Sequence, residues 1–310
     1  MINKKKRILF DDYLRNRVAT LEAEGRYSTA SNYRSAGNSL TKYLEKRPVR
    51  LDEIDRNLVE RYNAALYCRG ISRNTVSFYN RVLRAICNRA GSEGFQVAEH
   101  PFSGVYTGVS ATPKRALPKK VLQRIVAFDA EADRELSLTR DLFLFSFYAR
   151  GMSFVDMAFL RARNLSGAIL TYRRRKTGQA LTLRLESCMM SILEKYADLC
   201  FGDYLLPIIE SEDPVTAHRQ YVYRLHRHNL RLKELGQCCG AEYPLNSYAA
   251  RHSWATLASL ARVPVTVISA GLGHRSEQVT RIYLDSLSQG TIDRANKQVI
   301  AILLKGRNRC

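Results

Sequence analysis

A tyrosine and a histidine near the C-terminal end of the chain have the types and the spacing to attack a phosphate. Tyr283 follows His274 by nine residues, and His274 closes a Gly-Leu-Gly-His motif over residues 271–274. A phenol has a pKa of about 10, so it is a weak nucleophile unless cations and hydrogen-bond donors stabilise the charge that develops on the group under attack. If this pair attacks a phosphate, basic residues from elsewhere in the chain must lie close to it.

The composition supplies those basic residues. The 310 residues include 49 Lys and Arg against 29 Asp and Glu, which gives a net charge of +20. This charge favours a polyanionic partner. The basic residues spread through patterned helices instead of forming one stripe, which favours double-stranded nucleic acid over a membrane surface. A ribosomal or membrane-surface protein with the same charge is the alternative.

Length and cysteine usage limit the other possibilities. A chain of 310 residues with 45% apolar residues is long enough for two domains that each bury a core. The seven cysteines are odd in number and show no C-x-x-C spacing, so we expect neither a disulfide framework nor a zinc site, and a reducing cytoplasm fits best. The sequence contains no run of about 18 apolar residues, so we expect no membrane-spanning helix.

Residues 8–95 are predicted to form a helical domain. Apolar and aromatic residues recur there at helical spacing, with Ser28 and Ser72 as predicted N-caps and Gly70 as a helix end. The opposite helix faces carry arginines that could follow a phosphate backbone, although a solvated surface charge is the ordinary interpretation of any one of them. The residues assigned to DNA binding in this domain are Arg73, Arg81 and Arg84.

A linker is predicted over residues 96–117, where helical periodicity stops and prolines collect. It includes Lys114, which we assign to DNA binding, and a flexible basic connector would let two domains close around a duplex. Basic tails are expected at residues 1–7 and 306–310.

Residues 118–305 are predicted to form a second domain of helices with one small sheet. Leu181, Leu183 and Leu185 alternate with polar residues, and residues 176–178 form the turn of a basic β-hairpin between 168 and 185. The fold class is thus mostly α, with a small β-hairpin or sheet. Helices are expected at 187–200, 216–236, 247–261, 265–270, 276–285 and 289–304.

Several segments of the chain resemble one family. Residues 248–256, the 271–274 motif and Tyr283 resemble the catalytic half of the tyrosine recombinase (phage integrase) family, and residues 151–157 are similar to its first catalytic box. Residues 8–95 are similar to its helical core-binding, SAM-like domain. The resemblance implies that a tyrosine attacks a DNA phosphodiester, forms a 3′-phosphotyrosyl link and frees a 5′-hydroxyl. It further implies that four copies act on two DNA sites. The ester exchange keeps the bond energy, so no cofactor is expected.

The resemblance assigns a role to each matching residue. Tyr283 is the nucleophile. Arg251 matches the second arginine of the family, and the planar guanidinium of Arg251 binds two phosphate oxygens. His274 donates a hydrogen bond to the scissile phosphate. Lys176, in the hairpin turn, protonates the leaving 5′-oxygen. Arg174 and Arg175 beside it are assigned to DNA binding.

Two positions depart from the family pattern. Tyr248 stands where the family has a histidine, and a phenol can still donate a hydrogen bond there but cannot become a cation. Ser153 stands where the first arginine belongs. If residues 150–153 continue a helix, Arg150 lies on the same face as Ser153 and its guanidinium reaches the place of the first arginine. We therefore assign the role of the first catalytic arginine to Arg150. Arg174 is the competing donor, and Asp156 is expected to orient an arginine.

The function expected from these residues is site-specific DNA recombination or integration, typical of a mobile genetic element. Two alternatives remain open. The changes at Ser153 and Tyr248 could leave a catalytically impaired DNA-binding protein, or the enzyme could nick and rejoin DNA as a type IB topoisomerase does. A metal at His226 and His228 is not expected, because those side chains point apart on a helix and the flanking arginines repel a cation.

Overall fold

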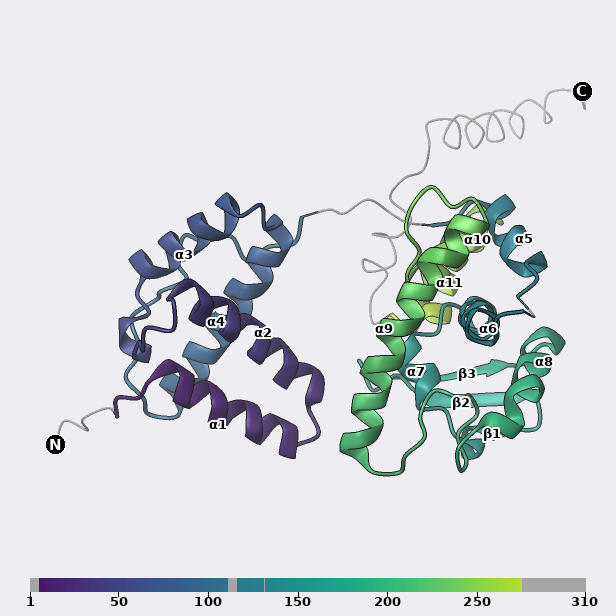
Figure 1. Cartoon of the computed structure of the whole chain (residues 1–310), viewed down its shortest axis with the longest axis horizontal. Coiled ribbons are helices and arrows are strands. Elements are labelled where there is room, and N and C mark those ends of the chain that lie inside the picture. The colour runs from purple at the N-terminus through teal and green to yellow at the C-terminus, as the bar shows by residue number, and fades with distance from the viewer. Residues whose placement is uncertain (1–5, 111–115, 131, 275–310) are drawn as a thin grey trace, which may run out of the picture. The chain divides into compact units, whose positions relative to one another are not determined.

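The computed structural model of the chain describes residues 6–110, 116–130 and 132–274 (Figure 1). It divides into two compact units, Met1–Thr112 and Pro113–Cys310. None of the helices in the described ranges is both long enough and apolar enough to cross a membrane.

The first unit is helical, as predicted, and its helix starts show which sequence signals were sound. Ser72 accepts a hydrogen bond from the backbone N–H of Thr75 and begins a helix, which confirms that cap. The Ser28 prediction is wrong, because the helix begins at Tyr27 and Ser28 lies inside its first turn. The helices are α1 (Phe10–Ala23), α2 (Tyr27–Tyr43), the 3₁₀ helix η1 (Leu51–Glu53), α3 (Arg56–Cys68) and α4 (Arg73–Ser92).

The apolar stripes of these helices form the core of the first unit. Tyr62 is completely buried, and its hydroxyl donates a hydrogen bond to Ser39 Oγ at 2.8 Å, so the polar end of the ring is satisfied. Burial raises the pKa of Tyr62 to about 12. Phe10, Leu40 and Ile86 are buried in the same core.

A segment after α4 is tied to that helix by buried polar side chains. Ser77 Oγ donates to the carbonyl of Gly108 at 2.5 Å, and Asn80 Nδ2 donates to the carbonyl of Tyr106 at 3.3 Å. Asn74 exchanges two hydrogen bonds with the backbone of Ser110. These bonds fix residues 106–110 on the first unit, although the sequence there has no helical or strand periodicity.

The second unit is built around α6, which contacts α8, α9 and α10 (Figure 1). A three-stranded antiparallel sheet in the order β1-β2-β3 lies beside these helices, and Tyr172 pairs with Leu181 in the predicted hairpin. The helices are α5 (Lys119–Ala127), α6 (Arg134–Tyr148), α7 (Phe154–Ala158), η2 (Ala162–Asn164), α8 (Ser187–Tyr196), η3 (Ala197–Leu199), α9 (Pro214–Cys238), α10 (Ala249–Leu260) and α11 (Val265–Leu272). The strands are β1 (Leu165–Ser166), β2 (Ile169–Arg173) and β3 (Ala180–Arg184).

The helices of this unit follow the sequence predictions with small shifts at their ends. The side chain of Asp213 caps α9 and Pro214 follows at its first turn, so α9 begins two residues before the predicted start at 216. Helix α8 ends at Tyr196 and continues as the 3₁₀ turn η3. The helices predicted at 276–285 and 289–304 lie outside the described residues.

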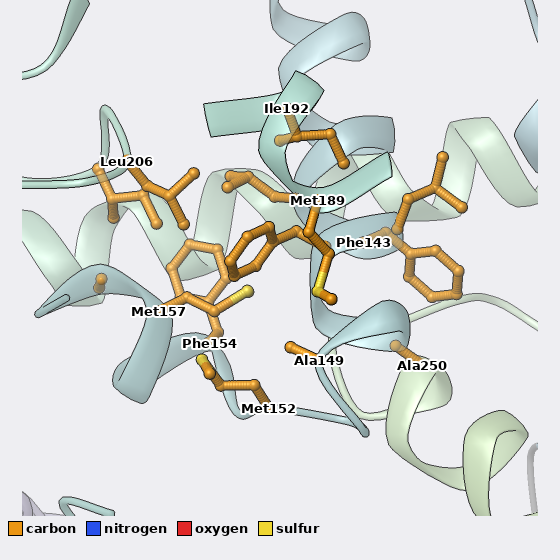
Figure 2. Close-up of a cluster of buried hydrophobic side chains, with 14 of the residues drawn as sticks. Phe143, Ala149, Met152, Phe154, Met157, Met189, Ile192, Leu206 and Ala250 are labelled. Carbon is orange, nitrogen blue, oxygen red and sulfur yellow. The ribbon is translucent and has the colours of Figure 1, made fainter. Parts of the chain in front are cut away.

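The core of the second unit holds the segment that carries the first catalytic box. Figure 2 shows Met152, Phe154 and Met157 gathered with Phe143 of α6 and Met189 of α8, and all five side chains are buried. Apolar burial at three positions of this short segment fixes its backbone. The polar residues between them are therefore held in defined places.

Candidate active site

Arg251 is buried at the start of α10, and backbone carbonyl groups hold its guanidinium. Only 4% of the residue is exposed. Its Nη1 donates to the carbonyl oxygen of Gly151 at 2.9 Å, and its Nη2 donates to that of Leu272 at 2.5 Å. Gly151 has a φ of +71°, and a Cβ there would lie 2.6 Å from the Cα of Arg251. A glycine is therefore required for the backbone to approach the guanidinium so closely.

A second guanidinium, that of Arg174, is held by the end of α11. Arg174 follows β2 in the hairpin and is 7% exposed. Its Nη1 donates to the carbonyl oxygen of Gly273 at 2.6 Å, one residue beyond the carbonyl that binds Arg251. Gly273 has a left-handed φ of +62° and ends α11. This turn directs two successive carbonyls toward two different arginines.

Asp156 connects the first catalytic box to the hairpin. Its Oδ2 accepts a hydrogen bond from Ser153 Oγ at 2.6 Å, and its Oδ1 accepts one from the backbone N–H of Arg175 at 2.8 Å. The Nε of Arg174 lies 4.0 Å from the same carboxylate. Ser153 is also the N-cap of α7. The carboxylate thus fixes the hairpin turn, as expected of a residue that orients an arginine.

His274 contacts Arg251 directly. Its Nε2 lies 2.9 Å from Arg251 Nη2. A guanidinium has only donors, so Nε2 accepts and the neutral ring carries its proton on Nδ1. Burial lowers the pKa of His274 to about 4, with further lowering by the charges of Arg251, Arg174 and Lys176. The imidazole is therefore neutral at physiological pH.

Both arginines and Ser153 line a cavity of about 190 Å³. Arg251, Arg174 and Lys176 contribute three positive charges to its lining, and Asp156 lies behind it with one negative charge. Two net positive charges suit a phosphate whose own charge rises as a nucleophile attacks it. The other lining residues are Gly151, Met152, Ser153, Phe154, Val155, Tyr221, Leu225, Ser247 and Tyr248.

Residues 150–153 do not continue helix α6, so the prediction that a helix places Arg150 on the same face as Ser153 is wrong. Helix α6 ends at Tyr148, and Arg150 and Gly151 both have left-handed backbones. The N–H groups of Gly151 and Met152 bond back to the carbonyl of Ser146, which turns the chain away from the helix axis. The Nη1 of Arg150 lies 3.5 Å from the carbonyl oxygen of Thr182, on the edge strand β3. Within the described ranges, Arg174 lines the cavity and Arg150 does not.

The remaining predicted site residues of the second unit lie at or near the cavity. Lys176 is exposed in the hairpin turn, and Tyr248 is 42% exposed immediately before α10; both line the cavity. Arg175 instead places its guanidinium 3.7 Å from the centre of the Phe159 ring. Burial lowers the pKa of Arg175. Stacking on an aromatic ring is a typical role for arginine within a fold.

The DNA-binding residues predicted in the first unit lie on α4. All three are exposed, and the guanidinium of Arg73 also lies 3.9 Å from the centre of the Tyr106 ring. Tyr283 and Lys114 lie outside the described residues.

Two residues of α9 line the cavity without having been predicted. Tyr221 and Leu225 are four positions apart and share one face of the helix. The sequence contained a signal for this pair, because the two apolar side chains lie in a helix otherwise rich in Arg and His.

The two histidines of α9 lie in different environments. His228, one turn beyond Leu225, is buried with its ring 4.8 Å from that of Phe154, while His226 is exposed. Among the described residues, no cluster of His, Cys, Asp or Glu has the composition of a metal site.

The two net positive charges of this cavity suit an enzyme that acts on a phosphate group, and comparison with known proteins identifies the family. Residues 9–105 match the phage integrase SAM-like domain, and residues 115–289 match the phage integrase family. The chain belongs to the phage integrase family, whose members are tyrosine recombinases that cleave and rejoin DNA in site-specific recombination.

Individual relatives agree with this assignment. The chain is 23% identical over 264 residues to a tyrosine recombinase of Pseudothermotoga lettingae, which covers 82% of this chain and 86% of the relative. Its fold is similar to XerH site-specific recombinase bound to palindromic difH in a post-cleavage complex (TM-score 0.64, 17% identity, 90% of this chain and 84% of the other). It is also similar to a lambda integrase tetramer bound to a Holliday junction (TM-score 0.63, 14% identity, 91% and 79%).

Proposed function

We propose that this recombinase cleaves duplex DNA by attack of Tyr283 on a phosphodiester, with formation of a 3′-phosphotyrosyl link and release of a 5′-hydroxyl. The observation that carries the proposal is the pair of buried guanidiniums, Arg174 and Arg251, which are held by neutral carbonyl groups and line one cavity. The carbonyls do not cancel the charge of the arginines, and Asp156, 4.0 Å from the Nε of Arg174, offsets only one of the three positive charges in the cavity lining. The positive field therefore remains available to a bound phosphate.

Each residue of the site then has a separate role. Arg251 and Arg174 bind the non-bridging oxygens, and Arg174 supplies the charge that Ser153 lacks. Neutral His274 and the phenol of Tyr248 donate hydrogen bonds to the same phosphate. When the phosphorus–oxygen bond breaks, Lys176 gives a proton to the 5′-oxygen, which leaves as a hydroxyl. In the second step that hydroxyl, or the one from a partner strand, attacks the phosphotyrosyl link.

We further propose that the partner is double-stranded DNA and that four copies assemble on two sites. The lambda integrase tetramer bound to a Holliday junction, which has the same fold, supports this arrangement. The six cysteines in the described ranges are free thiols, three of them exposed, which fits action in the reducing cytoplasm.

Strand exchange between two labelled duplexes tests the function against its alternatives. Target sites come from sequencing genomic fragments that the protein traps covalently. Mixing two duplexes with different flanking lengths should give products with exchanged flanks. Covalent adducts without exchanged flanks would instead indicate a topoisomerase-like enzyme. Binding without any adduct would indicate a DNA-binding protein that has lost catalysis, a reading that the placement of Arg174 beside Arg251 disfavours.

A further inference from the structure

The cavity is larger than one phosphate group requires. Its volume of about 190 Å³ equals the liquid volume of roughly six water molecules at about 30 Å³ each. A phosphate has five heavy atoms, and the side chains of Arg174 and Arg251 hold it from one part of the lining. Space therefore remains for the group attached to the phosphate.

Part of the remaining lining is apolar and comes from different elements than the arginines. Val155 lies on α7, and Tyr221 and Leu225 lie one turn apart on α9. The Tyr221 ring is fixed by neighbouring rings, because its centre lies 6.3 Å from that of Phe154 and 6.0 Å from that of Phe159. The side chains of Val155 and Leu225 and the ring face of Tyr221 pack against carbon–hydrogen groups and do not attract an anion.

The proposed role of Lys176 indicates which neighbouring group enters the cavity. Lys176 lines the same cavity as Tyr221 and Leu225. Under the function proposed above, on which this inference rests, Lys176 protonates the leaving 5′-oxygen. That oxygen is joined through a single carbon to its own sugar ring. We propose that the apolar lining of Val155, Tyr221 and Leu225 receives the deoxyribose that carries the leaving 5′-oxygen.

A consequence is selection against ribose at this one position. Deoxyribose presents a methylene group at C2′, which suits an apolar surface, whereas ribose presents a hydroxyl. A hydroxyl placed against Val155 and Leu225 loses its water partners without gaining protein ones. Apolar pockets reject an added hydroxyl by at most about 100-fold, so we expect adduct formation to slow by about tenfold to 100-fold.

The test is single-turnover cleavage of nicked duplexes that carry the chain's own target site. The sugar of the first nucleotide on the 5′-hydroxyl side of the scissile phosphate is deoxyribose, 2′-fluoro-deoxyribose or ribose. Because the fluoro group is not a hydrogen-bond donor, the rate of adduct formation on the 2′-fluoro duplex should stay close to the rate on the deoxyribose duplex. A ribose three nucleotides further along should have no effect, which controls for a general change in duplex geometry.

Protein variants locate the effect in the cavity. Leu225→Ser offers the ribose hydroxyl a partner and should reduce the deoxyribose-to-ribose rate ratio toward one. Leu230→Ala is the matched control, since Leu230 is 42% exposed on the same helix and should leave that ratio unchanged. Equal rates for both sugars in the unaltered protein would overturn this inference alone, and so would a ratio that Leu225→Ser leaves unchanged. Absence of any adduct on the all-deoxyribose duplex would overturn the proposed function and this inference with it.

Discussion

At the scale of single residues, we expect Arg174 of the hairpin to take the place of the arginine that the first box lacks. Ser153 caps α7 and donates to Asp156, and Asp156 binds the backbone of Arg175 next to Arg174. A short side chain at position 153 therefore has a structural task that an arginine could not perform. The same bonds bring the guanidinium of Arg174 to the cavity. Under the proposed function, the site thus keeps the positive charge of the missing arginine, although that charge comes from another position in the sequence.

This exchange predicts different outcomes for two arginine variants. Arg174→Ala removes a donor that binds the phosphate during the reaction, so the rate of covalent adduct formation should fall by about 10²–10³-fold. Arg150→Gly suits the left-handed backbone of that residue, whose φ is +58°, and should lower the rate by less than about tenfold. Single-turnover cleavage gives both rates, and thermal unfolding shows whether each variant is folded. Near-normal cleavage by Arg174→Ala together with none by Arg150→Gly would return the catalytic role to Arg150.

At the scale of helices and strands, local sequence signals predicted most of the fold. Ser72 begins α4 as expected, and the alternation at Leu181 and Leu183 gave the hairpin. The sequence signals failed where a residue adopts a backbone conformation that is unusual for its type. Arginine rarely has a left-handed backbone, so the turn at Arg150 resembled the continuation of a helix.

The site was only partly predictable for a related reason. Motif spacing singled out Arg251, but the carbonyls that hold its guanidinium belong to Gly151 and Leu272, which lie 100 and 21 residues away in the chain. Long-range contacts of this kind leave no periodic trace in the sequence. The part played by Tyr221 in the cavity depends equally on how α9 packs against α7.

The packing of α9 predicts a loss of stability in acid. Burial lowers the pKa of His228 to about 3, whereas in the unfolded chain it is about 6.5. As the pH falls below about 6.5, the unfolded chain takes up a proton that the folded protein refuses. The free energy of unfolding should therefore decrease by up to about 1.4 kcal/mol per pH unit from this residue. The effect is absent above about pH 7.

A histidine-to-phenylalanine variant isolates this contribution. His228→Phe keeps a ring against Phe154 and removes the titrating group. Urea unfolding measured from pH 7 to pH 4.5 should give a shallower acid decline for His228→Phe than for the unaltered protein. His226→Phe is the matched control on the same helix, because His226 is exposed. Parallel pH curves for His228→Phe and the unaltered protein would contradict the assignment.

At the scale of the whole molecule, the net charge of +20 is the property that DNA affinity depends on. If about eight phosphates are neutralised, the logarithm of affinity should fall with the logarithm of salt concentration at a slope near −7. Arg81→Ala and Arg84→Ala should each reduce that slope by about one. Arg89 on the same helix is already paired with Glu93 at 2.6 Å, so Arg89→Ala should leave it unchanged. A nearly flat salt response in a filter-binding titration would contradict phosphate tracking.

Covalent capture on a nicked duplex tests the central claim most directly. The unaltered protein should form an adduct that survives denaturation with detergent, while Tyr283→Phe should bind the duplex and form none. Tyr248→Phe keeps Tyr283 and should still give the adduct, at a reduced rate, which controls for the loss of a phenol as such. An adduct of undiminished yield with Tyr283→Phe would show that another residue attacks the phosphate, and the account of this site would then be wrong.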